Sequence, residues 1–254
     1  MSLRKTTLTT CVLFSLGISQ SGCQTASLER KFQTTIPLYD SVKELVEPEV
    51  IVKELFKEGN MARMFKHPCG ENDIVLEVDV VDYLKARALS LAVRFSEEDL
   101  IEPDNKYIRR LFEKLELPTK DLEEDAQRIL GFVQMVPYVK DITPYTKTVV
   151  ETLVEGGDCE DHTILAASMM NRLGIETVLV TFFDPKREVH QGIAVAGNFK
   201  GDYFDHSGTK YFYAETIGNP ERYEDSWQIG EYPSELVTYI PFVNGTKVTS
   251  GRVE

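Results

Sequence analysis

The stretch GGDCEDH, Gly156–His162, begins the segment whose pattern decides the predicted fold. Two glycines break the chain, and residues 159–173 then place apolar side chains on one helical stripe. Asp158 suits the N-cap of such a helix, and Asp161 falls in its first turn, where the helix dipole favours a carboxylate. Gly174 suits the position just after the helix. The sequence therefore predicts a helix that starts at or beside the cysteine of this stretch.

Three apolar segments after this helix indicate β-strands. Residues 175–183 are rich in β-branched and aromatic side chains, and residues 190–197 and 211–216 have similar patterns. Turn residues at Asp184-Pro185 and at Gly208 separate them. A helix followed by sequential strands with short connections predicts an α+β fold, with the helix packed on a mostly antiparallel sheet.

The first half of the chain has a different pattern. Residues 72–81 alternate apolar and polar side chains and predict a strand, whereas residues 83–95, 107–115 and 122–136 predict helices. We expect four parts: a leader at residues 1–23, a mostly helical N-terminal extension at 24–120, a domain with the cysteine-bearing helix at 121–245, and a C-terminal tail at 246–254.

Length and charge limit the possible functions. The chain has 254 residues and a formal net charge of -13. This length allows one or two domains with a real hydrophobic core. A strongly acidic surface repels phosphate backbones, so we expect no nucleic-acid partner.

The first residues have the features of an export signal. Arg4 and Lys5 precede a short, mostly apolar run, Leu8–Ile18, which cannot span a bilayer core of about 30 Å. Small residues come directly before Cys23, as in the cleavage box of bacterial lipoproteins, although Gln20 stands where that box usually has an aliphatic residue. We expect an exported protein, at the cell surface or in the periplasm, with lipid attached at Cys23. Plain secretion and an uncleaved membrane tether are the alternatives.

The start of a helix is a suitable place for a cysteine nucleophile. Backbone N–H groups there lack partners within the helix and the dipole end is positive, which stabilises a thiolate at Cys159. The same N–H groups can hold the oxyanion of a tetrahedral acyl intermediate. Gly156 and Gly157 would let a substrate backbone approach closely. A structural cysteine needs none of these features.

A thiol nucleophile needs a base, and the chain has four histidines. His67 is remote in the sequence, His206 falls in a polar segment, and His162 lies on the same helix as Cys159, one turn later. His190 begins a predicted strand and is the best candidate. Its face of the strand continues with small residues: Gly192, Ala194 and Ala196. We expect this face to leave room for the helix that carries the cysteine.

A third residue should orient the histidine. Tyr211, Tyr213 and Glu215 share one face of the next predicted strand. A carboxylate that follows aromatic residues needs a partner, and a neighbouring imidazolium would supply one. Asp205, in a polar segment that indicates a loop, is the alternative to Glu215, which we prefer.

The cysteine stretch resembles that of the transglutaminase-like cysteine peptidases of bacteria and archaea, within the papain-like transglutaminase superfamily. In that family a Gly-Asp-Cys-Glu-Asp block opens a helix that ends in Leu-Gly, here Gly157–Asp161 and Leu173-Gly174. Supporting matches occur on both sides of it: Phe132-Val133-Gln134, Pro137-Tyr138, Asp141, Glu151–Leu153, Tyr211–Thr216 and Trp227–Glu231. The resemblance covers residues 121–245.

The resemblance implies a papain-like fold with Cys159 as nucleophile, His190 as base and Glu215 as the orienting acid, a place where many members have aspartate. Gln134 matches a family-typical position, and the sequence leaves open whether it donates to an oxyanion. No cofactor is otherwise expected, but some relatives bind calcium through acidic residues beside the cysteine, which here would be Asp158, Glu160 and Asp161.

These features together predict thiol-dependent acyl transfer, in the first place hydrolysis of peptide or amide bonds in an extracytoplasmic protein substrate. Amide cross-linking through the same thioester is one alternative. A binding module that keeps the fold without turnover is a second. A metal-binding protein that uses Cys159, His162 and His190 is a third.

Overall fold

The computed structural model describes most of the chain after residue 59. The described residues are 60–65, 68, 73–92, 96–140, 145–183, 189–218, 227–233, 236, 240–243 and 245–253. The predicted leader with Cys23, and His67, lie outside them. Within the described part of the chain, no helix combines the length and the apolar character needed to span a membrane.

The chain divides into two compact units, and their bounds differ from the predicted ones. One unit consists of Arg63–Leu76 and Glu97–Glu254, and the other, Met1–Ala62 with Glu77–Ser96, contains helix α5 (Val80–Ala92). Strands β1 (Asn60–Phe65) and β2 (Ile74–Asp79) form a two-stranded sheet. The unit that contains the cysteine-bearing helix thus also includes residues 63–76 and 97–120, which the sequence assigned to the N-terminal extension.

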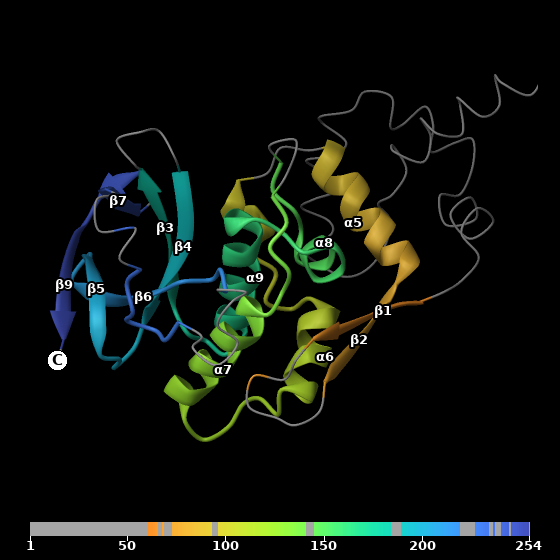
Figure 1. Cartoon of the computed structure of the whole chain (residues 1–254), viewed down its shortest axis with the longest axis horizontal. Coiled ribbons are helices and arrows are strands. Elements are labelled where there is room, and N and C mark those ends of the chain that lie inside the picture. The colour runs from red at the N-terminus through yellow and green to blue at the C-terminus, as the bar shows by residue number, and fades with distance from the viewer. Residues whose placement is uncertain are drawn as a thin grey trace, which may run out of the picture. The chain divides into compact units, whose positions relative to one another are not determined.

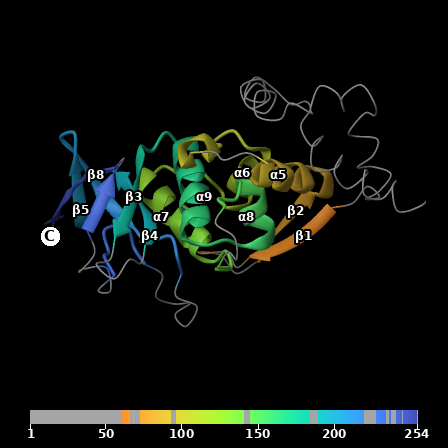
Figure 2. The same ribbon diagram turned by 90° about the horizontal axis from the view of Figure 1, so that it is seen from above.

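Among its described residues, this larger unit has five named helical segments. They are the 3-10 helix η1 (Glu97–Leu100) and helices α6 (Lys106–Lys114), α7 (Leu122–Gln134), α8 (Val149–Glu155) and α9 (Cys159–Arg172). Their first turns are set by the sequence, since a side chain at each N-cap of α6 to α9 accepts backbone N–H bonds. Helix α9 is buried throughout residues 161–170 and packs against α7, α8, β3 and β4. Figures 1 and 2 show these helices to one side of the large sheet.

The large sheet has seven strands in the order β8-β7-β3-β4-β6-β5-β9, and all of its pairings are antiparallel. The strands are β3 (Thr177–Phe183), β4 (Val189–Ala196), β5 (Gly201–His206), β6 (Thr209–Ala214), β7 (Ile240–Val243), β8 (Thr246–Lys247) and β9 (Thr249–Val253). The predicted combination of helices with a largely antiparallel sheet is confirmed. The segment expected to be a C-terminal tail, residues 246–254, instead supplies β8 and β9, because β8 pairs with β7 and β9 pairs with β5.

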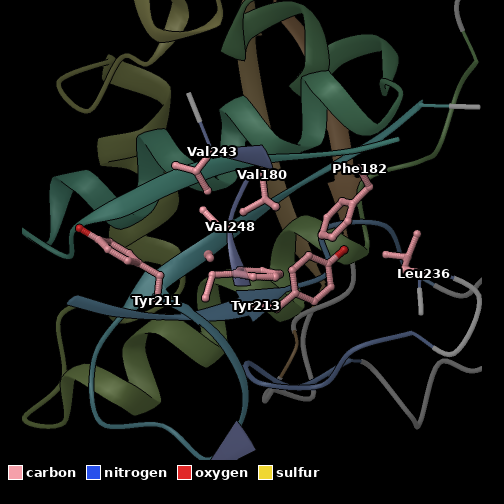
Figure 3. Packing of buried hydrophobic residues seen from close by; sticks show 9 residues of the cluster. Val180, Phe182, Tyr211, Tyr213, Leu236, Val243 and Val248 are labelled. Carbon is pink, nitrogen blue, oxygen red and sulfur yellow. The ribbon is translucent and has the colours of Figure 1, made fainter. Parts of the chain in front are cut away.

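One face of the curled sheet carries an aromatic core. Its buried members come from strands β3 to β7 and from residues outside these strands: Val180, Phe182, Ala194, Phe204, Tyr211, Tyr213, Leu236, Val243 and Val248. Figure 3 shows these side chains gathered together and labels seven of them. His190 belongs to the same face, because it lies opposite Phe182 in the β3–β4 register and their ring centroids are 6.1 Å apart. The base candidate is therefore placed at the end of a packed aromatic layer.

The small residues after His190 accommodate this aromatic layer. A methyl group at Gly192 would lie 3.0 Å from the hydroxyl and from Cε2 of Tyr213. Ala194 lies directly opposite Tyr213 in the β4–β6 register. The expectation that this face makes room for the cysteine-bearing helix was therefore wrong at Gly192, where a tyrosine ring takes the room.

Candidate active site

The start of α9 is fixed by residues next to the cysteine in sequence. Asp158 is the N-cap, and its side chain accepts bonds from the backbone N–H groups of Glu160 and Asp161. In return the Asp161 carboxylate accepts the Asp158 N–H at 3.1 Å, which completes a capping box. The predicted helix start at Cys159 is confirmed. Because Asp158 occupies two of the first N–H groups, the N–H of Cys159 itself, at the first helical position, remains for other partners.

The two glycines before the cysteine make room for the protein's own chain. Gly156 has a positive φ of 79°, and a Cβ there would lie 2.3 Å from the carbonyl oxygen of Pro137. Gly157 donates to that carbonyl at 3.2 Å, and its own carbonyl accepts the N–H of Val139 at 2.8 Å. A Cβ at Gly157 would also lie 2.4 Å from the Cβ of Asp161. The glycines were predicted to admit a substrate backbone; in the structure they admit residues 137–139 and Asp161.

A buried ion pair anchors the first turn of α9. The Asp161 carboxylate accepts the backbone N–H of Lys147 at 2.7 Å and its ammonium group at 3.1 Å. The two side chains are only 0% and 2% exposed. Burial raises the pKa of Asp161 to about 7, while the two contacts with Lys147 oppose the rise. Asp161 was predicted to act at the helix dipole, and its pairing with Lys147 was not predicted, since nothing in the sequence marks a loop lysine as buried.

The structure brings Cys159, His190 and Glu215 together. Nε2 of His190 lies 2.9 Å from Oε2 of Glu215, and the Cys159 thiol interacts with the His190 ring and helps to raise its pKa. Cys159 is a free cysteine with partial exposure, and the His190 side chain is 23% exposed. Since Nε2 faces Glu215, the other ring nitrogen, Nδ1, is left for the thiol.

The surroundings of His190 favour its protonated form. Burial by itself lowers the pKa of this imidazole, but the hydrogen bonds to Cys159 and Glu215 and the negative charges of both outweigh burial. The net effect raises the pKa of His190 from 6.5 to about 10. At neutral pH the site therefore holds an imidazolium between two acidic groups.

Several donors fix Glu215, which is only 4% exposed. Its Oε2 accepts the hydroxyl of Tyr213 at 2.7 Å as well as His190, and its Oε1 accepts the backbone N–H of Ile217 at 2.8 Å. The Gln134 amide donates to the Glu215 carbonyl oxygen at 2.7 Å and to that of Trp227 at 3.1 Å. Both Gln134 donor hydrogens are thus used within the protein, so this residue positions Glu215 and the 227–233 segment.

The other candidates for the base and the orienting acid have partners outside the Cys159–His190–Glu215 group. Asp205 and His206 are in β5 rather than in a loop, and the Asp205 carboxylate accepts the N–H of Gly208. The His162 ring is fully buried and faces the carbonyl oxygens of Thr216 and Pro137 at 3.3 and 3.4 Å. Burial lowers its pKa, although these contacts oppose the shift. His162 is therefore suited to joining three segments behind the site.

The residues considered for metal binding have protein partners. Asp158 and Asp161 serve the capping box, and Glu160 accepts a bond from the Thr146 hydroxyl at 3.3 Å. Across the described ranges, no group of three or more His, Cys, Asp or Glu side chains is arranged to hold a metal ion.

Comparison with known proteins gives a single distant likeness to report. No family model and no curated protein matches this sequence. A solved structure from Cytophaga hutchinsonii, described provisionally as a cysteine protease, aligns at a TM-score of 0.36 and 13% identity. The alignment covers 61% of this chain and 53% of that one, so the chain matches about half the length of this structure. At this level, the likeness assigns neither a family nor a function.

Proposed function

We propose that the protein is a thiol-dependent acyl-transfer enzyme that hydrolyses peptide or amide bonds, in the manner of the transglutaminase-like cysteine peptidases. The observation that supports this most is the imidazole of His190 between the Cys159 thiol and the Glu215 carboxylate. A cysteine at a helix start, a histidine and an orienting acid are the groups that activate a thiol toward carbonyl carbon.

The first half of the reaction forms a thioester. His190 holds the thiol proton, and the Cys159 thiolate attacks the carbonyl carbon of the substrate, so a C–S bond forms as the carbonyl oxygen becomes an oxyanion. The N–H of Cys159, which the Asp158 cap leaves without a helical partner, is suited to bind that oxyanion. The His190 imidazolium then gives its proton to the amide nitrogen, the C–N bond breaks and the amine leaves.

The second half releases the acid. The neutral imidazole of His190 takes a proton from water, and the hydroxide oxygen attacks the thioester carbonyl. A C–O bond forms, the C–S bond breaks, and the thiolate–imidazolium pair is restored. Glu215 keeps the imidazole oriented throughout, since Tyr213, Ile217 and His190 all donate to its carboxylate.

The setting of this activity rests on the sequence alone. We include in the proposal that residues 1–23 direct export, that Cys23 is lipidated, and that the substrate is an extracytoplasmic protein or peptide. Mass spectrometry of the membrane fraction would detect a diacylglyceryl modification at Cys23, and an unmodified Cys23 would remove the anchor from the proposal.

Peptide cleavage tests the reaction itself. The purified protein is incubated with a proteome-derived peptide library and a biotinylated primary amine, and products are identified by mass spectrometry. We expect new peptide ends and an acyl adduct on Cys159, both lost in Cys159→Ser. Biotin transfer to glutamine side chains without cleavage would favour cross-linking. Wild-type protein that gives no adduct and no product, like Cys159→Ser, would favour a binding module.

A further inference from the structure

Two tyrosines on strand β6 make the same kind of contact. Tyr211 and Tyr213 point to the same face, and each donates its hydroxyl to a glutamate at 2.7 Å, Glu176 and Glu215 respectively. The two contacts differ in the other donors that the acceptor glutamate has. Glu215 Oε2 is shared between Tyr213 and His190, at 2.7 and 2.9 Å, and Tyr213 is 0% exposed.

We infer that Tyr213 is a positioning residue of the site: its hydroxyl shares one carboxylate oxygen of Glu215 with His190 and so limits how strongly that carboxylate holds the imidazolium. This inference rests on the proposed function, since it concerns the same proton transfers. It also accounts for the glycine at position 192. A Cβ there would lie 3.0 Å from the Tyr213 hydroxyl and would displace it.

Glu215 keeps its place without the Tyr213 hydroxyl. The backbone N–H of Ile217 still holds Oε1, and the Gln134 amide still holds the Glu215 carbonyl. The carboxylate is 4% exposed, so it would remain beside His190 with one donor fewer. Its negative charge would then fall more fully on the bond to His190, because a charge-assisted hydrogen bond strengthens when a competing donor is removed.

The groups that titrate around this bond are few among the described residues. Cys159 faces His190 from α9, and Tyr213 and Glu215 face it from β6 and the residues after it. Tyr232 stacks near Tyr213 with ring centroids 5.1 Å apart. Burial and the charge of Glu215 raise the pKa of Tyr213 well above its ordinary value, so Tyr213 stays a neutral donor in the working range.

The consequence is a balance between two steps of the proposed reaction. Attack needs His190 to keep a proton, and breakdown of the tetrahedral intermediate needs His190 to release that proton to the amine. A carboxylate that pulled harder on the imidazolium would favour the first step and slow the second. Tyr213 therefore keeps His190 able to act as an acid.

Proton NMR of the full chain tests this directly. The proton between His190 Nε2 and Glu215 should give a far-downfield resonance, assigned by its loss in His190→Gln. We expect Tyr213→Phe to move it further downfield and to lower kcat roughly tenfold, the change that one pKa unit of the acid represents. Tyr211→Phe, which loses the matching bond to Glu176, should leave the chemical shift of this proton and kcat unchanged. Replacement of Tyr213 by 3-fluorotyrosine, a stronger hydrogen-bond donor, should move the resonance upfield. This second variant tests the role of the hydroxyl even if Tyr213→Phe does not fold.

The outcomes separate the two claims. The role of Tyr213 would be overturned if Tyr213→Phe and Tyr211→Phe gave the same resonance and the same rate. An upfield shift in Tyr213→Phe would overturn it as well. Either outcome would leave the catalytic proposal in place. Absence of any His190-dependent downfield resonance in the wild-type protein would count against the His190–Glu215 pair and hence against the proposed function.

Discussion

Two buried carboxylates, Asp161 and Glu215, belong to the candidate site, and the protein pairs them with different partners. Asp161, in the first turn of α9, is paired with the ammonium group of Lys147 in a buried ion pair. Glu215, beyond the end of β6, is paired with His190, whose charge changes when it gives up a proton. The first pair anchors the start of a helix, whereas the second holds the imidazole that moves the proton in the proposed reaction. Four experiments test this contrast.

The largest effect on stability is expected at the lysine side. Lys147→Met removes the cation and leaves Asp161 buried without its counter-ion, so we expect the free energy of unfolding to fall by about 3–5 kcal/mol. Urea denaturation measures this loss. Lys200→Met, at an exposed lysine of the same unit, should change it by less than about 0.5 kcal/mol. Equal stability of the two variants would remove the structural role assigned to the Asp161–Lys147 pair.

The histidine side should respond in activity rather than in stability. Glu215→Gln keeps the shape of the side chain but removes the charge that helps to raise the pKa of His190 to about 10. We expect that pKa to fall toward 6.5, measured by NMR titration of the imidazole, and the rate of substrate cleavage to fall about 100-fold or more. Glu176→Gln, which faces Tyr211 instead, is the matched control. A His190 pKa that stays near 10 in Glu215→Gln would show that Glu215 is not its partner.

A smaller effect is expected at Gln134. Gln134→Met loses the bonds to the carbonyl oxygens of Glu215 and Trp227, but it also removes Oε1, which is buried without a hydrogen-bond partner among the described residues. We expect the free energy of unfolding to fall by about 1 kcal/mol and the rate of substrate cleavage to fall by less than tenfold. Gln127 on the same helix bonds Trp227 and Ile229 but not Glu215. Gln127→Met should therefore lose stability without slowing cleavage, and a similar slowing in both variants would contradict the positioning role of Gln134.

The sequence was most informative where neighbouring residues determine the structure. Asp158 and Asp161 cap α9 from within one turn of Cys159, so the helix start could be predicted from local pattern. The preference for Glu215 over Asp205 as the partner of His190 also agrees with the contact seen, because period-two alternation placed Glu215 on the face of Tyr213.

Distant contacts explain the parts that the sequence did not predict. Gly156 and Gly157 pack against Pro137 and Val139, some twenty residues earlier, and no local pattern reveals that contact. Strand β5 was taken for a loop because its glycine and aspartates lack the usual strand composition, and pairing with β6 and β9 outweighs that composition. Residues 246–253 join the sheet for the same reason.

Alkylation of Cys159 tests the thiolate–imidazolium pair most directly. The full chain is treated with iodoacetamide from pH 5 to 9, and modification of the Cys159 peptide is followed by mass spectrometry, which separates it from Cys11, Cys23 and Cys69. We expect Cys159 to react at pH 6 much faster than a free thiol does, and His190→Gln to remove that advantage while His206→Gln keeps it. If Cys159 follows the pH profile of a free thiol in the wild-type protein and His190→Gln changes nothing, the proposed catalytic pair does not exist.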